Sequence, residues 1–244
     1  MDSLLSKLRR SPELMSMVKR VRGYIPISDN TRTGALHRSW GMIFSSHMRG
    51  DYLEFGVYQG RSFIEAYKQY QLFAKWMADE MKSSESWRRK VAQTYIDYQP
   101  KFYAYDTFEG MPDNNEGSVN FAKGTFLGNE DKVRAECLKN RFPESLFKLK
   151  KGLFSNLKQS DLPERAAIIN IDCDLYSSAM DALNICKPLF QQGTILLADD
   201  YNTFAASNNA GERKAIKEFS EKTGIKFEPW FPYHYIGQAF ITHI

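Results

Sequence analysis

Ala166-Ala-Ile-Ile-Asn-Ile-Asp172 is an almost continuous apolar run that ends on an acidic residue. Such a run predicts a strand that is buried on both faces, as in the centre of a parallel sheet. Gly193-Thr-Ile-Leu-Leu-Ala-Asp199 repeats the pattern after a stretch with helical periodicity over residues 177–190. The two runs therefore predict parallel strands joined by a helix, with an aspartate at the end of each strand.

The rest of the chain continues this alternation of strand and helix. Further strands are expected at residues 51–57, 101–105 and 146–150, and two aromatic-rich strands after residue 227. Because strand and helix alternate, we predict the α/β class, with a mostly parallel sheet and helices on both faces. Helical patterns occupy residues 35–47, 62–98 with a break at 82–84, 130–140, 154–159 and 211–223.

A length of 244 residues suits one α/β domain over residues 1–244. The sequence contains no linker, internal repeat or low-complexity tract that would divide it. Within it we expect an N-terminal helical cap over residues 1–48, which begins with an amphipathic pattern, and a core over residues 49–244. The helical excess at about residues 68–98 is interpreted as an insertion into this core.

Composition argues against several classes of protein. The 33 basic and 29 acidic residues give a net charge of +4, short of the clustered excess that nucleic-acid binding requires. No apolar run approaches the roughly 20 residues that span a bilayer, and the N-terminus lacks a secretory signal pattern. Three cysteines without a Cys-x-x-Cys pair indicate reduced thiols and no zinc site. We expect a cytoplasmic homo-oligomer, a dimer, with a small-molecule substrate and no nucleic-acid or membrane partner.

The first candidate motif is Glu54-Phe-Gly56-Val-Tyr58-Gln-Gly60-Arg-Ser62, at the end of the first core strand. Its glycines let the backbone approach a ligand, and the following helix offers free N–H groups to an anion. A tight turn without a ligand is the alternative. Glu54 favours a ligand, because a buried carboxylate requires a partner such as an ammonium group. The motif does not complete the Gly-x-Gly-x-x-Gly dinucleotide pattern.

The second candidate is Asp106, in Tyr105-Asp-Thr-Phe-Glu-Gly-Met-Pro. In nucleoside-binding α/β folds, an acidic residue at the end of the second strand accepts hydrogen bonds from ribose hydroxyls. A cap on a turn or helix is the alternative role. The segment that follows, up to residue 129, is rich in glycine and weakly periodic, so we expect it or residues 23–34 to form a lid.

The third and strongest motif is acidic. Asp172-Cys-Asp174-Leu-Tyr follows one apolar strand, and Asp199-Asp200-Tyr201 follows the next. If the strands are neighbours, these carboxylates meet at one edge of the sheet, where ligands gather in such folds. Carboxylates packed this closely need a cation to stay ionised. Oxygen ligands suit Mg²⁺ or a similar hard ion, whereas an isolated Asp-Asp pair could merely begin a solvated loop.

With these three motifs the chain resembles the macrocin O-methyltransferase (TylF-type) family of sugar O-methyltransferases. The matching segments also include Lys151-Gly-Leu-Phe and Ile171-Asp-Cys-Asp-Leu-Tyr-Ser-Ser, and they run in the family's order over about residues 50–240. The resemblance implies a Rossmann-like class I methyltransferase fold with a seven-stranded sheet. It also implies dependence on S-adenosylmethionine and Mg²⁺, and a substrate that is a sugar or a glycosylated small molecule.

The resemblance also implies roles for individual residues. Asp172, Asp199 and Asp200 would hold the metal, and Asp174 would be the general base. Asp106 would bind the ribose of the cofactor, and the turn Gly152–Phe154 would lie near its adenine. The methionine end of the cofactor would be surrounded by Glu54, Gly56, Tyr58, Gly60 and Ser62.

Two departures from the family leave the acceptor open. Gln59-Gly60-Arg61 stands where the family usually has Arg-Gly-Gly, and the insertion near residues 70–98 is longer than usual. Two alternative functions also stay open at this point. A nicotinamide-dependent oxidoreductase is disfavoured by the incomplete glycine pattern, and a non-catalytic cofactor-binding scaffold subunit is disfavoured by the intact aspartates.

Overall fold

The computed structural model describes residues 30–116 and 119–244, and within them seven strands form one sheet in the order β3-β2-β1-β4-β5-β7-β6. β7 pairs antiparallel with both of its neighbours, and the other pairs are parallel. The strands are β1 Asp51–Phe55, β2 Phe102–Asp106, β3 Phe147–Lys151, β4 Ala166–Ile171, β5 Ile195–Ala198, β6 Lys226–Tyr233 and β7 Gly237–His243. The prediction of a mostly parallel, seven-stranded sheet is confirmed.

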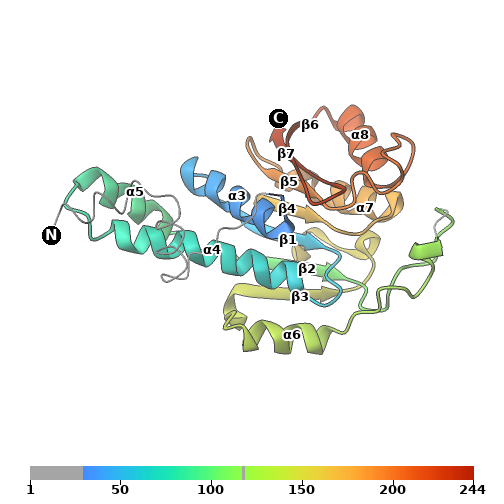
Figure 1. Cartoon of the computed structure of the whole chain (residues 1–244), viewed down its shortest axis with the longest axis horizontal. Coiled ribbons are helices and arrows are strands. Elements are labelled where there is room, and N and C mark those ends of the chain that lie inside the picture. The colour runs from blue at the N-terminus through green and yellow to red at the C-terminus, as the bar shows by residue number, and fades with distance from the viewer. Residues whose placement is uncertain (1–29, 117–118) are drawn as a thin grey trace, which may run out of the picture.

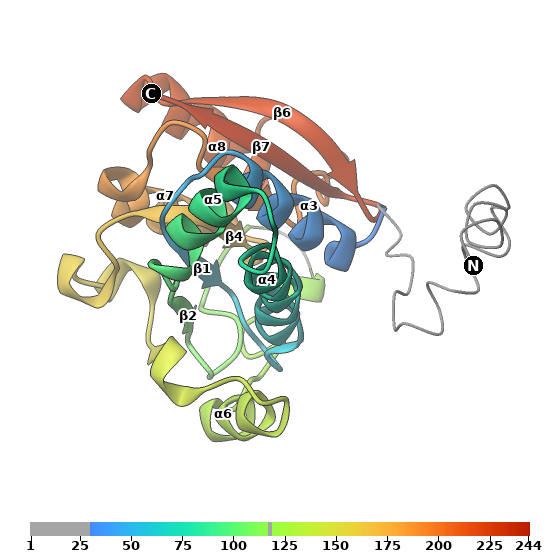
Figure 2. The same ribbon diagram turned by 90° about the vertical axis from the view of Figure 1, so that its left-hand side faces the viewer.

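Helices cover both faces of the sheet (Figures 1 and 2). α3 and α4 lie on one face, and α7 and α8 pack against each other on the opposite face. α5 follows α4 at one end of the molecule, and α6 lies beside β3. The α-helices described are α3 Arg32–Ser45, α4 Arg61–Glu80, α5 Ser86–Ile96, α6 Glu130–Lys139, α7 Tyr176–Cys186 and α8 Gly211–Thr223. None of the helices in the described part of the chain could cross a membrane.

The strand side chains alternate between two cores because successive residues of a strand point to opposite faces. Tyr52 and Phe102 join the aromatic core beneath α3 and α4. Leu53 and Tyr103, their neighbours in the chain, join the core beneath α7 and α8. Burial of β4 over its full length agrees with its position at the centre of the sheet. This alternation and the parallel pairing fix which residues emerge together at the edge where the strands end.

Two expectations need a correction or fall outside the described residues. Residues 154–159 do not form the predicted short helix but two separate 3₁₀ turns, Phe154–Asn156 and Gln159–Asp161, because Leu157 and Lys158 between them are extended. Further 3₁₀ turns are Val119–Phe121, Glu144–Leu146 and Lys187–Leu189. The structure does not describe residues 1–29. Most of the predicted cap over residues 1–48 and most of the segment 23–34 therefore lie outside the described residues.

Candidate active site

A cavity of about 740 Å³ opens at the edge of the sheet where β1, β2, β4 and β5 end. The segments that follow these four strands line it, together with α3 and the loop after β2. The lining residues that the sequence singled out are Gly56, Tyr58, Ser62, Asp106, Phe154, Asp172, Asp174, Asp199 and Asp200. The structure therefore brings the glycine turn and the aspartates, which are far apart in the chain, to one space.

Asp106 braces the glycine turn. One of its carboxylate oxygens accepts hydrogen bonds from the backbone N–H groups of Val57 at 2.7 Å and Tyr58 at 2.8 Å. The other oxygen accepts from the N–H of Phe108 at 2.7 Å. Three of the roughly four lone-pair sites of a carboxylate are thereby used, so one remains for a ligand hydroxyl.

Glu54 lies behind the turn and is fully buried. Its carboxylate accepts a hydrogen bond from the hydroxyl of Tyr52 and another from the hydroxyl of Ser62, at 2.7 Å. Burial raises the pKa of Glu54 to about 7, and the two hydroxyls oppose that shift. The predicted site residues that the cavity wall does not include are Glu54, Gly60 and Gly152.

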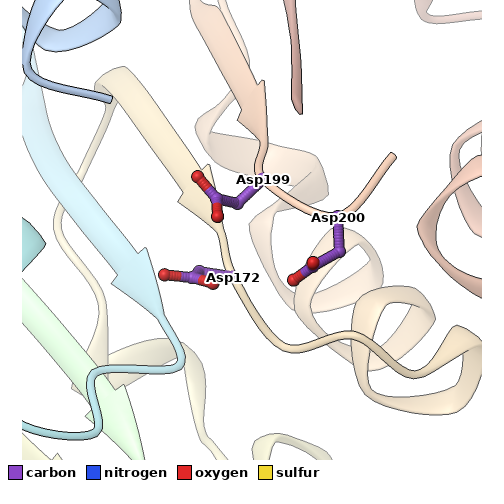
Figure 3. A group of neighbouring side chains, drawn as sticks. All are labelled: Asp172, Asp199 and Asp200. Atoms are coloured by element: carbon purple, nitrogen blue, oxygen red, sulfur yellow. The ribbon is translucent and has the colours of Figure 1, made fainter. Parts of the chain in front are cut away.

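The aspartate cluster follows from the register of two strands. Ile171, the last residue of β4, is paired with Ala198, the last residue of β5, and the N–H of Asp199 donates to the Ile171 carbonyl at 2.9 Å. Asp172 and Asp199 are thus adjacent, and Asp200 follows in the loop (Figure 3). One oxygen from each of the three carboxylates lies within 4.8 Å of the others.

Arg32 and His234 are the basic groups in contact with this cluster. The Arg32 Nε donates to Asp199 Oδ1 at 2.8 Å, and another guanidinium nitrogen lies 3.3 Å from Asp172 Oδ2. His234 Nε2 lies 3.2 Å from Asp199 Oδ1. Burial works against ionisation of Asp199, but His234 and Arg32 hold its pKa below the usual value. Burial and the Asp199 charge raise the pKa of Asp172 well above its usual value.

Asp174 lies at the cavity wall in an uncommon backbone conformation, with φ of +59°. Aspartate and asparagine tolerate this left-handed region better than other side chains that carry a β-carbon. Burial and the Asp200 carboxyl raise the pKa of Asp174 to about 8. Without a bound metal ion, burial and the neighbouring carboxylates therefore favour the protonated forms of Asp172 and Asp174.

Glu212 was missed by the sequence analysis. It is fully buried in the first turn of α8, and its carboxylate accepts from the Asp200 N–H at 3.1 Å and the Cys173 N–H at 3.4 Å. It thereby ties together the backbone segments that follow β4 and β5. No local pattern reveals this role, nor that of Arg32, because both depend on contacts between segments far apart in the chain.

The loop after β2 contributes Met111, Phe121 and Phe126 to the cavity wall. Glu116 attaches this loop to the start of α7, since its carboxylate accepts from the backbone N–H groups of Tyr176 at 2.6 Å and Ser177 at 3.0 Å. The free N–H groups at a helix start favour a negative charge there. The predicted lid segment therefore forms part of the cavity wall, and its action as a lid stays a prediction.

Comparison with known proteins adds a family to this geometry. A model of the macrocin-O-methyltransferase (TylF) family matches residues 88–231. The 8-demethyl-8-(2,3-dimethoxy-alpha-L-rhamnosyl)-tetracenomycin-C 4'-O-methyltransferase of Streptomyces olivaceus is 24% identical over an alignment of 191 residues that covers 75% of this chain. The match covers 62% of the length of that curated relative.

Solved structures share the fold at low identity. The O-methyltransferase NovP gives a TM-score of 0.64 at 18% identity, over 86% of this chain and 78% of its own. The calicheamicin methyltransferase CalS11 gives 0.61 at 19% identity, over 98% and 90%. A second structure of CalS11, described as a TDP-rhamnose 3'-O-methyltransferase, gives 0.51 at 18% identity, over 98% and 92%. These likenesses confirm the predicted Rossmann-like fold.

Proposed function

The chain belongs to the macrocin-O-methyltransferase (TylF) family, and we propose that it transfers a methyl group from S-adenosylmethionine to a hydroxyl of a sugar or a glycosylated small molecule, with a divalent metal ion held by aspartates. One observation carries this proposal. A single cavity joins the glycine turn to the aspartate cluster, so the two reactants can meet between them. Bringing reactants together in an oriented way supplies much of the rate enhancement of a group transfer.

The glycine turn suits the cofactor. Gly56 has no side chain and a φ of +92°, so the turn can bring its backbone close to a ligand at this point of the cavity wall. Asp106 fixes this backbone and keeps one acceptor site for a ribose hydroxyl. Phe154 offers an apolar wall for the adenine. The Ser62 hydroxyl donates to one oxygen of Glu54. Glu54 would therefore contact the ammonium group of the cofactor only after this hydroxyl had shifted, or would influence it indirectly through Ser62.

The aspartate cluster suits Mg²⁺ or a similar hard divalent ion. Three carboxylates from adjacent strand ends supply oxygen ligands within 4.8 Å of one another, and softer sulfur or nitrogen ligands are not part of that group. In our proposal Asp172, Asp199 and Asp200 hold the ion. When bound, the ion lowers the pKa of a hydroxyl of the acceptor and orients its oxygen.

Asp174 is our candidate for the general base. It lies on the cavity wall next to the proposed ligands, and no ion pair with a basic residue of the described chain occupies its carboxylate. A pKa of about 8 without a cation falls in the range in which a carboxylate can take a proton from a hydroxyl. A positive charge bound beside it would lower that pKa and keep Asp174 ionised at neutral pH.

The proposed acceptor class rests on the family and on the activities for which two relatives are named. The Streptomyces olivaceus protein acts on a rhamnosyl group of a tetracenomycin, and CalS11 acts on TDP-rhamnose. We propose a deoxysugar hydroxyl, free as a nucleotide sugar or already attached to an aglycone. The cavity wall also includes Phe121, Ser178 and Thr203. It therefore offers both an apolar surface and hydroxyl groups, which suit a sugar that carries a methyl group.

A methyl-transfer screen tests the proposal. The protein is incubated with S-adenosylmethionine labelled in the methyl group and a panel of free sugars, TDP-sugars, rhamnosylated aglycones and catechols, in Mg²⁺ or in EDTA. We expect transfer to a sugar hydroxyl in Mg²⁺, and calorimetry should show cofactor binding in EDTA as well. Full activity in EDTA, with no metal retained by the protein, would contradict the metal site. Binding of NAD(H) without any binding of S-adenosylmethionine would contradict the whole proposal.

A further inference from the structure

Arg32 lies across two of the three aspartates that we propose as metal ligands. It is the first residue of α3, and its Nε donates to Asp199 Oδ1 at 2.8 Å. A second guanidinium nitrogen pairs with Asp199 Oδ2, and a third lies 3.3 Å from Asp172 Oδ2. The guanidinium therefore bridges the ends of β4 and β5.

A guanidinium in this position occupies the same oxygens as a divalent ion would. Both oxygens of Asp199 pair with Arg32, and Asp199 and Asp172 each supply an oxygen to the group of three within 4.8 Å. Positive charges that share so small and buried a space repel each other more strongly than in water. Full coordination of an ion by Asp172 and Asp199 therefore requires the guanidinium to move.

Arg32 has room to move. Its side chain is 40% exposed and lines the cavity, whereas the side chain of Asp199 is only 4% exposed. The start of α3 does not depend on the Arg32 side chain, because the Thr31 hydroxyl caps the helix by accepting from the Gly34 N–H at 2.9 Å. Rotation about the side-chain bonds of Arg32 would release both carboxylates while the helix stays intact.

We propose that Arg32 is a built-in counter-ion of the metal site, which holds Asp172 and Asp199 together in the metal-free protein and is displaced when a divalent ion binds. Without any cation, the two carboxylates would repel each other across the strand ends. With Arg32 in place they stay in position, but the ion must compete with a two-point, charge-assisted contact. This inference rests on the proposed metal site, and it makes Arg32 a residue that sets the affinity of that site.

Mn²⁺ binding to the full chain tests the inference without any activity assay. Titration by electron paramagnetic resonance, in the absence of cofactor and acceptor, compares the wild type with Arg32→Gln. We expect the variant to bind Mn²⁺ more tightly, on the order of tenfold, because the competing contact is gone. Arg32→Lys keeps the charge but not the planar fork that bridges two carboxylates. Its affinity should lie between the other two.

Arg38→Gln is the matched control. Arg38 lies on the same helix, and its substitution removes the same charge. Its guanidinium carbon, however, lies 3.6 Å from the centre of the Phe231 ring. Its Mn²⁺ affinity should stay near that of the wild type. If Mn²⁺ affinity rose equally in Arg32→Gln and Arg38→Gln, the loss of one positive charge would explain the rise, and the inference would be overturned.

The remaining outcomes separate the inference from the proposed function. Weaker or unchanged Mn²⁺ binding by Arg32→Gln would overturn the competition and leave the metal site standing. No Mn²⁺ binding by any of the proteins would overturn the metal site and the inference together. If Arg32→Gln failed to fold, the NMR signal of the Arg32 side-chain N–H in the wild-type protein would test whether the guanidinium is displaced. The signal should shift on addition of Mg²⁺, and a constant signal under saturating Mg²⁺ would overturn the displacement.

Discussion

A β-carbon added to Gly56 would lie 1.8 Å from the carbonyl oxygen of Asp172. The end of β1 can therefore approach the end of β4 only because residue 56 lacks a side chain, and its φ of +92° also favours glycine. Gly56 therefore bears on the proposed metal site as well as on the proposed cofactor turn, because a shift of the Asp172 backbone would move a proposed ligand.

Gly56→Ala should therefore weaken Mn²⁺ binding as well as cofactor binding. We expect a loss of stability of roughly 1–3 kcal/mol or more from the backbone strain and the clash, and a lower affinity for both ligands in the protein that remains folded. Gly224→Ala is the control, because Gly224 has a similar φ of +78° but no heavy atom within 4 Å of its added β-carbon. Calorimetry and thermal melts compare them. Normal Mn²⁺ affinity in folded Gly56→Ala would refute the coupling.

Substitutions in the aspartate cluster should separate the base from the ligands. Asp174→Asn keeps a side chain that tolerates the φ of +59° but cannot accept a proton. Its kcat should fall by about 10²–10⁴ with little change in Mn²⁺ affinity. Asp172→Asn, Asp199→Asn and Asp200→Asn should instead weaken metal binding, and excess Mg²⁺ should restore part of their rate. An Asp174→Asn enzyme with most of the wild-type kcat would remove this residue from the mechanism.

Glu54 should make stability depend on pH. Its pKa of about 7 in the folded protein exceeds the ordinary value of 4.5, so the folded state keeps the proton longer than the unfolded chain. The contribution of Glu54 is therefore fully present below about pH 4.5 and is lost as pH rises through 7, by about 3 kcal/mol in total. The free energies of unfolding of wild type and Glu54→Gln should diverge over this window, with the wild type losing more. A constant difference from pH 4.5 to 8 would contradict the prediction.

Glu212 should control metal affinity without touching the metal. Glutamine at this position has one acceptor oxygen for two backbone N–H groups, so the segment at Asp200 or the one at Cys173 must shift. We expect Glu212→Gln to weaken Mn²⁺ binding about 10–100-fold, as loss of groups that orient metal ligands does, and to keep cofactor affinity. Glu218→Gln serves as the control, because Glu218 lies on the same helix but contacts the Tyr176 hydroxyl and Lys214 instead of the backbone near the cluster. Equal Mn²⁺ affinities in the two variants would disprove the role.

Glu116 should hold the lid loop in place. Glu116→Ala removes two hydrogen bonds to the start of α7, which are together worth about 1 kcal/mol as a helix cap. Hydrogen exchange over residues 107–129 should become several-fold faster, and product cofactor with a sugar acceptor should slow it again. Asp113→Ala in the same loop is the control, because Asp113 makes an exposed pair with Lys123. If the two variants exchange alike, Glu116 does not hold the loop.

The sequence predicted the sheet and the aspartate cluster because both depend on local patterns. Uninterrupted apolar runs marked β4 and β5 as central, and the acidic residue that ends each run had to emerge at the same edge once the strands were parallel. The chemistry that we propose for the cluster rests on residue type as well. Neither step needed knowledge of contacts between distant segments.

The residues that surround the aspartate cluster could not be predicted in this way. Arg32, His234 and Glu212 reach the cluster from α3, from the turn between β6 and β7 and from α8, and none of them carries a local signature of that contact. Asp106 was expected to bind the ribose of the cofactor or to cap a turn, and its hydrogen bonds join the turn after β1 to the turn after β2, two segments far apart in the chain. Such contacts appear only when the packing of whole elements is known.

The position of β1 between β2 and β4 has a consequence for synthesis of the chain. β1 and β2 leave the ribosome early, but the second edge of β1 has no partner until β4 has been made. Until then β1, an apolar strand that is buried in the folded protein, has unpaired backbone groups along one edge that other chains can reach. We therefore expect the pairing of β4 with β1 to end the stage at which the growing chain aggregates most readily, whereas the aspartate cluster is complete only after β5 has been made.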